Sequence, residues 1–108
     1  MSERMVRQFM EMVAIDSESG NEARFMAYLL DEVARAGGRG SLDAYGNLIA
    51  SFPAKGATTA EPILLSCHGD TVKPGVGIVP VLGGDGVIRS GGDTILGADD
   101  KAGIAEVL

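Results

Sequence analysis

The residues best suited to chemistry in this sequence form two short clusters, of which the first is His68-Gly69-Asp70, just after the apolar run Ile63–Ser66. Neutral histidine is the commonest metal ligand, and a ligating histidine usually gives its second ring N–H to a carboxylate or carbonyl. Residues i and i+2 of an extended segment point to the same side, so we expect Asp70 to lie behind His68 and orient it. The alternative is an ordinary hydrogen-bonded loop histidine, because so short a motif has many chance matches.

The second cluster is Asp99-Asp100-Lys101. Paired carboxylates suit a divalent cation, and one carboxylate can bridge two ions. The alternative is helix capping, because an Asp before a helix is a routine N-cap and Asp100 in the first turn would complement the helix dipole. Taken alone, this cluster favours capping. Lys101 is then expected to form a neighbouring ion pair of little consequence.

Other polar residues near these clusters are expected to be structural. Cys67 beside His68 suggests a nucleophile and its base, but adjacent residues of an extended segment face opposite sides. We therefore expect Cys67 to be buried as a small apolar residue. Ser17 and Ser19 are expected to shape the polar turn that contains them.

Two helices are predicted ahead of these clusters. The first has Ser2 as its N-cap and ends near Ile15. The second begins at about Asn21, with Asn21 as its cap, and ends at Gly37-Gly38. Each carries an apolar stripe at helical spacing, formed by Met5, Val6, Phe9, Met10 and Val13 in the first and by Phe25, Met26, Leu29, Leu30 and Val33 in the second.

Short strands are predicted in the second half of the chain. Residues 47–52 read as a strand, and Ile63–Ser66 reads as a strand buried on both faces. A loop is predicted over residues 55–62, and a hairpin around Gly83–Gly86. The order of helices followed by strands and a further helix predicts an α/β domain with mixed β-sheet strands.

The last helix begins close to the end of the sequence and has no cap, which predicts an incomplete domain. In such a domain the run Ile63–Leu65 and the tail Ile104–Leu108 should lack full cover and promote association.

The charge balance excludes several partners. Nine basic and fifteen acidic residues give a net charge of −6, which argues against nucleic acid and anionic membranes as partners. No apolar stretch approaches the roughly 20 residues of a membrane span, and charged residues interrupt the N-terminus where a signal peptide would be apolar. A single cysteine excludes an internal disulfide. We expect a cytoplasmic protein.

Read with their neighbours, the two clusters resemble motifs of one enzyme family. The run His68–Gly75 resembles the H-x-D-T-V-x-P-G motif of M20 metallopeptidases. The run Ile95–Gly103 is similar to the L-G-A-D-D-K-A-G motif of the tripeptidase-T-like branch of that family. The opening helix and the IDSESGNE segment are also similar to the N-terminal segment of the family, so the resemblance covers nearly the whole chain.

The resemblance implies specific roles for these residues. His68 would bind one zinc ion, Asp99 would bridge two, and Asp70 would be the catalytic carboxylate that orients His68. Cobalt or manganese are alternatives to zinc. The peptide bond between Asp99 and Asp100 is expected to be cis. Residues 1–108 would form the N-terminal portion of a zinc-peptidase catalytic domain, without its remainder and without the lid or dimerisation domain.

The function implied by the resemblance is metal-dependent hydrolysis of short peptides by an aminopeptidase or tripeptidase, a homodimer at full length. The D-D-K-A-G run favours this branch, because deacylases and carboxypeptidases tend to carry D-M-K-G-G. The general-base Glu and further ligands would lie beyond Leu108, so the chain by itself is expected to be inactive. An N-acyl amino acid amidohydrolase of the same superfamily and a non-catalytic truncated fragment are the alternatives.

Overall fold

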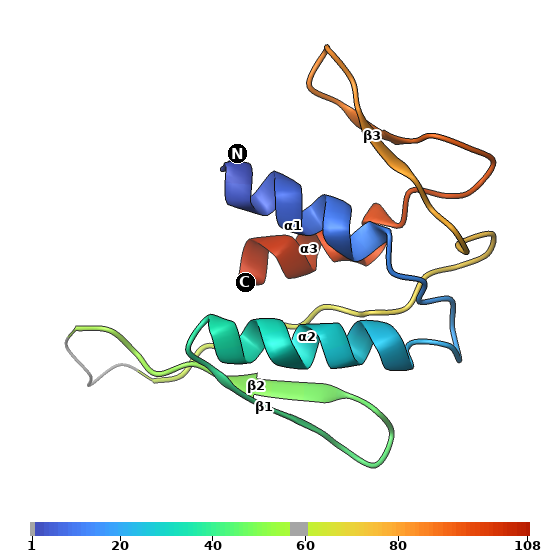
Figure 1. Cartoon of the computed structure of the whole chain (residues 1–108). Helices are drawn as coiled ribbons and strands as arrows, with labels where there is room; N and C mark the ends of the chain where they lie inside the picture. Colours follow the sequence, from blue (N-terminus) through green and yellow to red (C-terminus); the bar gives the residue numbers. More distant parts are fainter. Residues whose placement is uncertain (1, 57–60) are drawn as a thin grey trace.

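The computed structural model of the chain describes residues 2–56 and 61–108. These residues form helices α1 (Glu3–Val13) and α2 (Ala23–Arg35), strands β1 (Arg39–Leu42), β2 (Leu48–Ser51), β3 (Pro80–Leu82) and β4 (Ile88–Ser90), and helix α3 (Ala98–Val107). Helix α2 lies between the β1–β2 hairpin and the pair formed by α1 and α3, and the β3–β4 hairpin projects from the helical part (Figure 1). The predicted α/β class is confirmed.

The hydrophobic core lies where the three helices meet. Its buried members come from α1, α2, α3 and one loop, and are Phe9, Met12, Val13, Phe25, Leu29, Ile78, Ile104 and Ala105. Two of them, Ile104 and Ala105, belong to the tail that was expected to lack cover. That expectation is wrong for these two residues, because α3 packs against α1 and removes them from solvent.

Both predicted helices are present, with one change at a helix start. Ser2 caps α1, since its side-chain oxygen accepts a hydrogen bond from the backbone N–H of Met5 at 3.1 Å. Helix α2 begins at Ala23, and its N-cap is Glu22 rather than Asn21. The Glu22 carboxylate instead accepts a hydrogen bond from the backbone N–H of Gly20. Helix α2 ends as predicted, where Gly37 adopts a φ of 88° that few other residues tolerate.

The strands pair as two separate antiparallel hairpins, where a mixed sheet was expected. Strand β1 pairs with β2 so that Leu42 lies opposite Leu48, and β3 pairs with β4 so that Leu82 lies opposite Ile88. The hairpin predicted around Gly83–Gly86 is confirmed. Strand β1 was not predicted, because its sequence RGSL has neither alternation nor β-branched residues.

The run Ile63–Ser66 is not a strand in this structure, and the prediction that both its faces are buried is wrong. The side chains of Ile63, Leu64 and Leu65 are 86%, 91% and 64% exposed. No strand of the described residues pairs with this run, which leaves its apolar side chains without cover, as expected for Ile63–Leu65. Of the predicted loop at 55–62, residues 57–60 lie outside the described residues.

None of the helices described here, of which α2 is the longest at 13 residues, is long and apolar enough to cross a lipid bilayer.

Candidate metal centre

The two sequence clusters meet in the folded chain. Nε2 of His68 lies 2.9 Å from Oδ1 of Asp99, although the two residues are 31 positions apart. His68 lies in the loop that follows Ile63–Ser66, and Asp99 lies at the start of α3. The structure thus brings the predicted ligands within reach of one another.

The start of α3 is irregular, and this irregularity turns Asp99 outward. Gly97 has a φ of 82°, and both Asp99 and Asp100 have backbone angles outside the helical range. The peptide bond between Asp99 and Asp100 is cis, as the resemblance implied. The Asp99 side chain is 95% exposed, so its carboxylate is available to a ligand as well as to His68.

The capping role considered for Asp99 is not what the structure shows. The N-terminus of α3 has no capping hydrogen bond from the side chain of its N-cap, which is Gly97. The Asp99 carboxylate contacts the imidazole of His68 instead.

Asp70 lies where the i and i+2 spacing predicts, on the other edge of the His68 ring. Nδ1 of His68 is 3.0 Å from the backbone oxygen of Asp70 and 3.1 Å from its Oδ1. Both partners are acceptors, so Nδ1 carries a proton and donates it. The 2.9 Å contact of Nε2 with the Asp99 carboxylate is a hydrogen bond only when Nε2 is protonated as well, because both carboxylates are acceptors. In the neutral ring, a proton held on Nδ1 would leave the Nε2 lone pair available to a metal ion.

Contacts within this cluster shift the pKa values of His68 and Asp70 toward their charged forms. The hydrogen bond to Asp99 is the main reason that the pKa of His68 is raised above its ordinary value, and the contacts with Asp70 act in the same direction. The pKa of Asp70 is lowered, first by a hydrogen bond from Ser19 and then by His68. Asp70 therefore remains ionised and keeps its acceptor role toward the imidazole.

Lys101 is buried, although the sequence analysis predicted only an ion pair of little consequence. Its side chain is only 1% exposed, and Nζ donates a 2.8 Å hydrogen bond to the backbone oxygen of Ile15. Burial lowers the pKa of Lys101 to about 8, against an opposing effect of Asp16. The signal was present in the spacing, because Lys101 shares one helical face with Ile104, Ala105 and Leu108.

The turn that contains Ser17 and Ser19 also contacts Asp70 and the loop that follows His68. The hydroxyl of Ser19 donates a 2.5 Å hydrogen bond to Oδ2 of Asp70. Carboxylates from the same turn accept hydrogen bonds from the loop that follows His68: Glu18 from the N–H of Gly75 and Asp16 from that of Gly77, both at 2.9 Å. That loop also contains a cis peptide bond before Pro74, which was not predicted.

The expectation of a buried Cys67 is wrong, because the thiol is exposed. The expectation placed Cys67 on the opposite side of an extended segment from His68, but no strand of the described residues pairs with the preceding run to cover that side. Partial burial, followed by the nearby carboxylate of Asp100, raises the pKa of the thiol above its ordinary value. The thiol is therefore a weak nucleophile at neutral pH.

The residues present fit part of a metal centre. An imidazole nitrogen and a carboxylate oxygen are a suitable donor pair for zinc. Asp70 cannot join them on one ion, because it contacts the opposite ring nitrogen. Within the described part of the chain, no three His, Cys, Asp or Glu side chains gather to hold an ion. His68 and Asp99 thus amount to two ligands.

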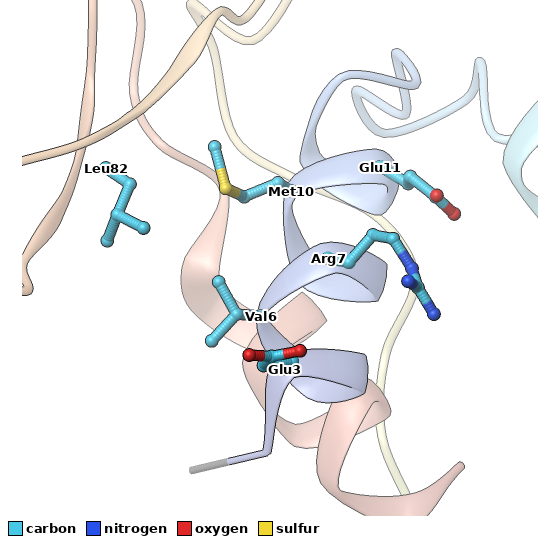
Figure 2. A pocket seen from close by; sticks show the side chains of 6 residues that line it. All are labelled: Glu3, Val6, Arg7, Met10, Glu11 and Leu82. Atoms are coloured by element: carbon cyan, nitrogen blue, oxygen red, sulfur yellow. The ribbon is translucent and has the colours of Figure 1, made fainter.

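A separate hollow lies along the outer face of α1 (Figure 2). Its lining combines apolar side chains of α1 and β3 with charged side chains of α1, namely Glu3, Val6, Arg7, Met10, Glu11 and Leu82. None of the candidate residues described above lines it. The hollow is therefore separate from the meeting point of His68 and Asp99.

Solved peptidase structures share this backbone. A tripeptidase from Staphylococcus aureus subsp. aureus Mu50 matches with a TM-score of 0.86 and 36% identity, over 96% of this chain and 30% of the tripeptidase. The aminopeptidase PepT from Bacillus cereus ATCC 10987 matches with a TM-score of 0.91 and 42% identity, over 97% of this chain and 30% of PepT. The chain therefore corresponds to the N-terminal portion of an M20 peptidase-like fold.

A curated protein shows the same partial match. The uncharacterized protein YqjE from Bacillus subtilis (strain 168) is 37% identical over 117 residues, covering 97% of this chain and 30% of YqjE. No family model matches the chain. The chain thus spans about a third of the length of each of these three proteins.

Proposed function

We propose that this chain supplies part of the metal centre of a peptidase that removes residues from the free amino end of short peptides. The observation that carries the proposal is the 2.9 Å contact between Nε2 of His68 and Oδ1 of Asp99, with Asp70 on the other edge of the ring. The similarity to a tripeptidase and to an aminopeptidase supports a peptide as the substrate.

Each residue would have a distinct task in this centre. The imidazole of His68 and the carboxylate of Asp99 would hold a zinc ion. Asp70 would keep the proton on Nδ1 and so present the Nε2 lone pair. The second carboxylate oxygen of Asp99 accepts no hydrogen bond from the residues described here, so it would be available to a further ion. When bound, zinc would polarise the carbonyl group of the substrate.

The proposal extends to the rest of the protein. Residues 1–108 would be the N-terminal portion of a catalytic domain whose remaining ligands and general-base Glu lie outside this chain, together with a lid or dimerisation domain. The complete site would hold two zinc ions, with cobalt or manganese as alternatives, in a cytoplasmic homodimer. The chain by itself would be inactive, and hydrolysis of a tripeptide by this polypeptide alone would contradict that statement.

Zinc affinity of the purified chain tests the proposal directly. Competition with a chromophoric chelator would be measured for the unmodified chain and for His68→Ala and Asp99→Ala. We expect weak zinc binding that decreases by more than about tenfold in both variants. Asp93→Ala, which removes another carboxylate from an exposed position, and Cys67→Ser, which removes a neighbouring soft ligand, should leave the affinity unchanged. Equal affinity in the chain and both ligand variants would contradict the proposal.

A further inference from the structure

The turn Ile15–Ser19, called here the clamp segment, contacts both halves of the candidate centre. At one end, the Ser19 hydroxyl donates to Oδ2 of Asp70, whose Oδ1 faces His68. At the other end, the Ile15 carbonyl accepts the hydrogen bond of Lys101 Nζ at 2.8 Å. Lys101 lies two positions after Asp99 in the chain, so both predicted ligands are tied to the same short segment.

The clamp segment is itself held firmly. The backbone of Ser17 accepts from the N–H of Thr71 at 2.9 Å, and the N–H of Ser19 donates to the Thr71 oxygen at 3.1 Å. These two bonds form a parallel bridge between the turn and the loop after His68. Ser17 and Thr71 are 0% and 3% exposed. A segment anchored by one buried residue and by paired backbone groups is a stable reference for the side chains that bind to it.

The Asp99 carboxylate, by contrast, has few contacts that fix its position. Its side chain is 95% exposed, and an exposed carboxylate samples several rotamers. Its position over His68 therefore depends on where the backbone at the start of α3 lies. Lys101 fixes that backbone, because its ammonium group is bound to Ile15 and lies 4.3 Å from the centre of the Phe25 ring.

We propose that Ser19 and Lys101 are positioning residues, through which the clamp segment sets the His68 imidazole and the Asp99 carboxylate relative to each other. This inference rests on the proposed function for its purpose, although the geometry can be tested without metal. Ser19 restrains the rotation of the Asp70 carboxylate, so that Oδ1 stays directed at Nδ1 of His68. Lys101 holds the first turn of α3, so that Asp99 stays in reach of Nε2.

A buried lysine is well suited to a role in geometry. An apolar side chain of similar volume usually stabilises a core as much as a buried polar group does, or more. Met in place of Lys101 would keep the packing against Phe25 and lose the hydrogen bond to Ile15 and the cation–π attraction. Stability and positioning are therefore separable by experiment at this residue.

The single histidine of the chain makes the test direct. In chain labelled with ¹⁵N-histidine, at a pH high enough that the ring is neutral, a two-bond ¹H–¹⁵N spectrum reports which ring nitrogen of His68 carries the proton. Asp70 at Nδ1 and Asp99 at Nε2 compete for the one proton of the neutral ring, so we expect a smaller Nδ1–H fraction in Ser19→Ala than in the unmodified chain. Ser19→Thr retains the hydroxyl and should restore the Nδ1–H form. Ser17→Ala removes a buried hydroxyl of the same turn that has no hydrogen-bond partner among the described residues, and should leave the tautomer unchanged.

The effect of Lys101→Met is measured by a second signal. The nuclear Overhauser contact between the His68 ring and the Asp99 methylene should be present in the unmodified chain and lost in this variant. Lys73→Met removes an exposed cation and should retain the contact. We also expect zinc affinity to decrease about tenfold in Ser19→Ala and in Lys101→Met.

The outcomes separate this inference from the proposed function. A chain that binds no zinc but shows both nuclear magnetic resonance changes supports the positioning roles and contradicts the metal site. A chain that binds zinc through His68 and Asp99, with no change of tautomer in Ser19→Ala and no loss of contact in Lys101→Met, overturns the positioning roles alone. A lower melting temperature without either spectral change also overturns them, because it indicates structural roles only.

Discussion

The ammonium nitrogen of Lys101 lies 4.3 Å from the centre of the Phe25 ring. Phe25 is 0% exposed and belongs to the core where α1, α2 and α3 meet. A cation over an aromatic face is attracted by the ring quadrupole, so Phe25 both fills the core and supports the residue that holds the start of α3. The packing of the core and the geometry of the candidate centre are thus coupled through this pair.

Replacing Phe25 should therefore destabilise the fold strongly. We expect Phe25→Ala to lower the free energy of unfolding by about 3–5 kcal/mol, because it leaves a cavity among fully buried side chains. Tyr45→Ala, which removes a ring that is 94% exposed, should change it by less than about 0.5 kcal/mol. Urea denaturation followed by circular dichroism measures both values. Similar losses in the two variants would show that the core is not centred on Phe25.

Zinc should stabilise the folded chain, and its removal should reverse the effect. A ligand that binds only the folded state contributes about 2.7 kcal/mol when its concentration is 100 times its dissociation constant. We expect the melting temperature to rise as zinc is added and to return to its initial value with a chelator. His68→Ala should abolish the rise. An equal rise in the variant would place zinc elsewhere on the chain.

Asp43 should make the β1–β2 turn sensitive to acid. Its Oδ1 accepts hydrogen bonds from the N–H groups of Tyr45 and Asn47, and its Oδ2 accepts one from the Asn47 side chain, each at 2.9 Å. These bonds, that of the Asn47 side chain first, hold the pKa of Asp43 below its ordinary value of 3.8. The ionised carboxylate therefore stabilises the turn above about pH 4, and this contribution is lost as the pH falls through the lowered pKa.

Carbon-13 titration of the Asp43 carboxyl measures this pKa. In Asn47→Ala the pKa should move back toward the ordinary value, because the largest cause of its shift is removed. An Asp43 pKa that is the same in both proteins would contradict the assigned hydrogen bonds.

The exposed run Ile63–Leu65 should cause self-association. Leu64 is 91% exposed, and apolar patches on a surface promote association. We expect Leu64→Ser to reduce the concentration dependence of the sedimentation coefficient with little effect on stability. The matched change at a buried position, Leu29→Ser, should unfold the chain instead. A chain that sediments as a monomer at all concentrations would contradict the prediction for Leu64.

The substrate class can be tested in the longer protein that we propose. In the proposed function the longer protein acts at a free amino end, and so a free tripeptide should be hydrolysed while its N-acetylated form should not. Release of amino acids, measured by chromatography, distinguishes the two. The reverse preference would support the N-acyl amino acid amidohydrolase.

Local patterns were sufficient to predict the parts of this fold that depend on neighbours in the sequence. The apolar stripe of α1, its cap at Ser2 and the glycine-rich turn between β3 and β4 all follow from spacings of a few residues. The same holds for Asp70 behind His68, which are two positions apart. Such contacts are decided by backbone geometry within one element.

Long-range packing decided the rest. Ile63–Ser66 has the composition of a buried strand, but a strand forms only where another strand supplies the hydrogen-bond partners of its backbone. The contact between His68 and Asp99 spans 31 positions, and Lys101 of α3 contacts both the turn after α1 and helix α2. Sequence by itself identified which residues could form a centre. Only the tertiary structure decided that Ser19 and Lys101 connect them, because those bonds join segments whose approach no local pattern records.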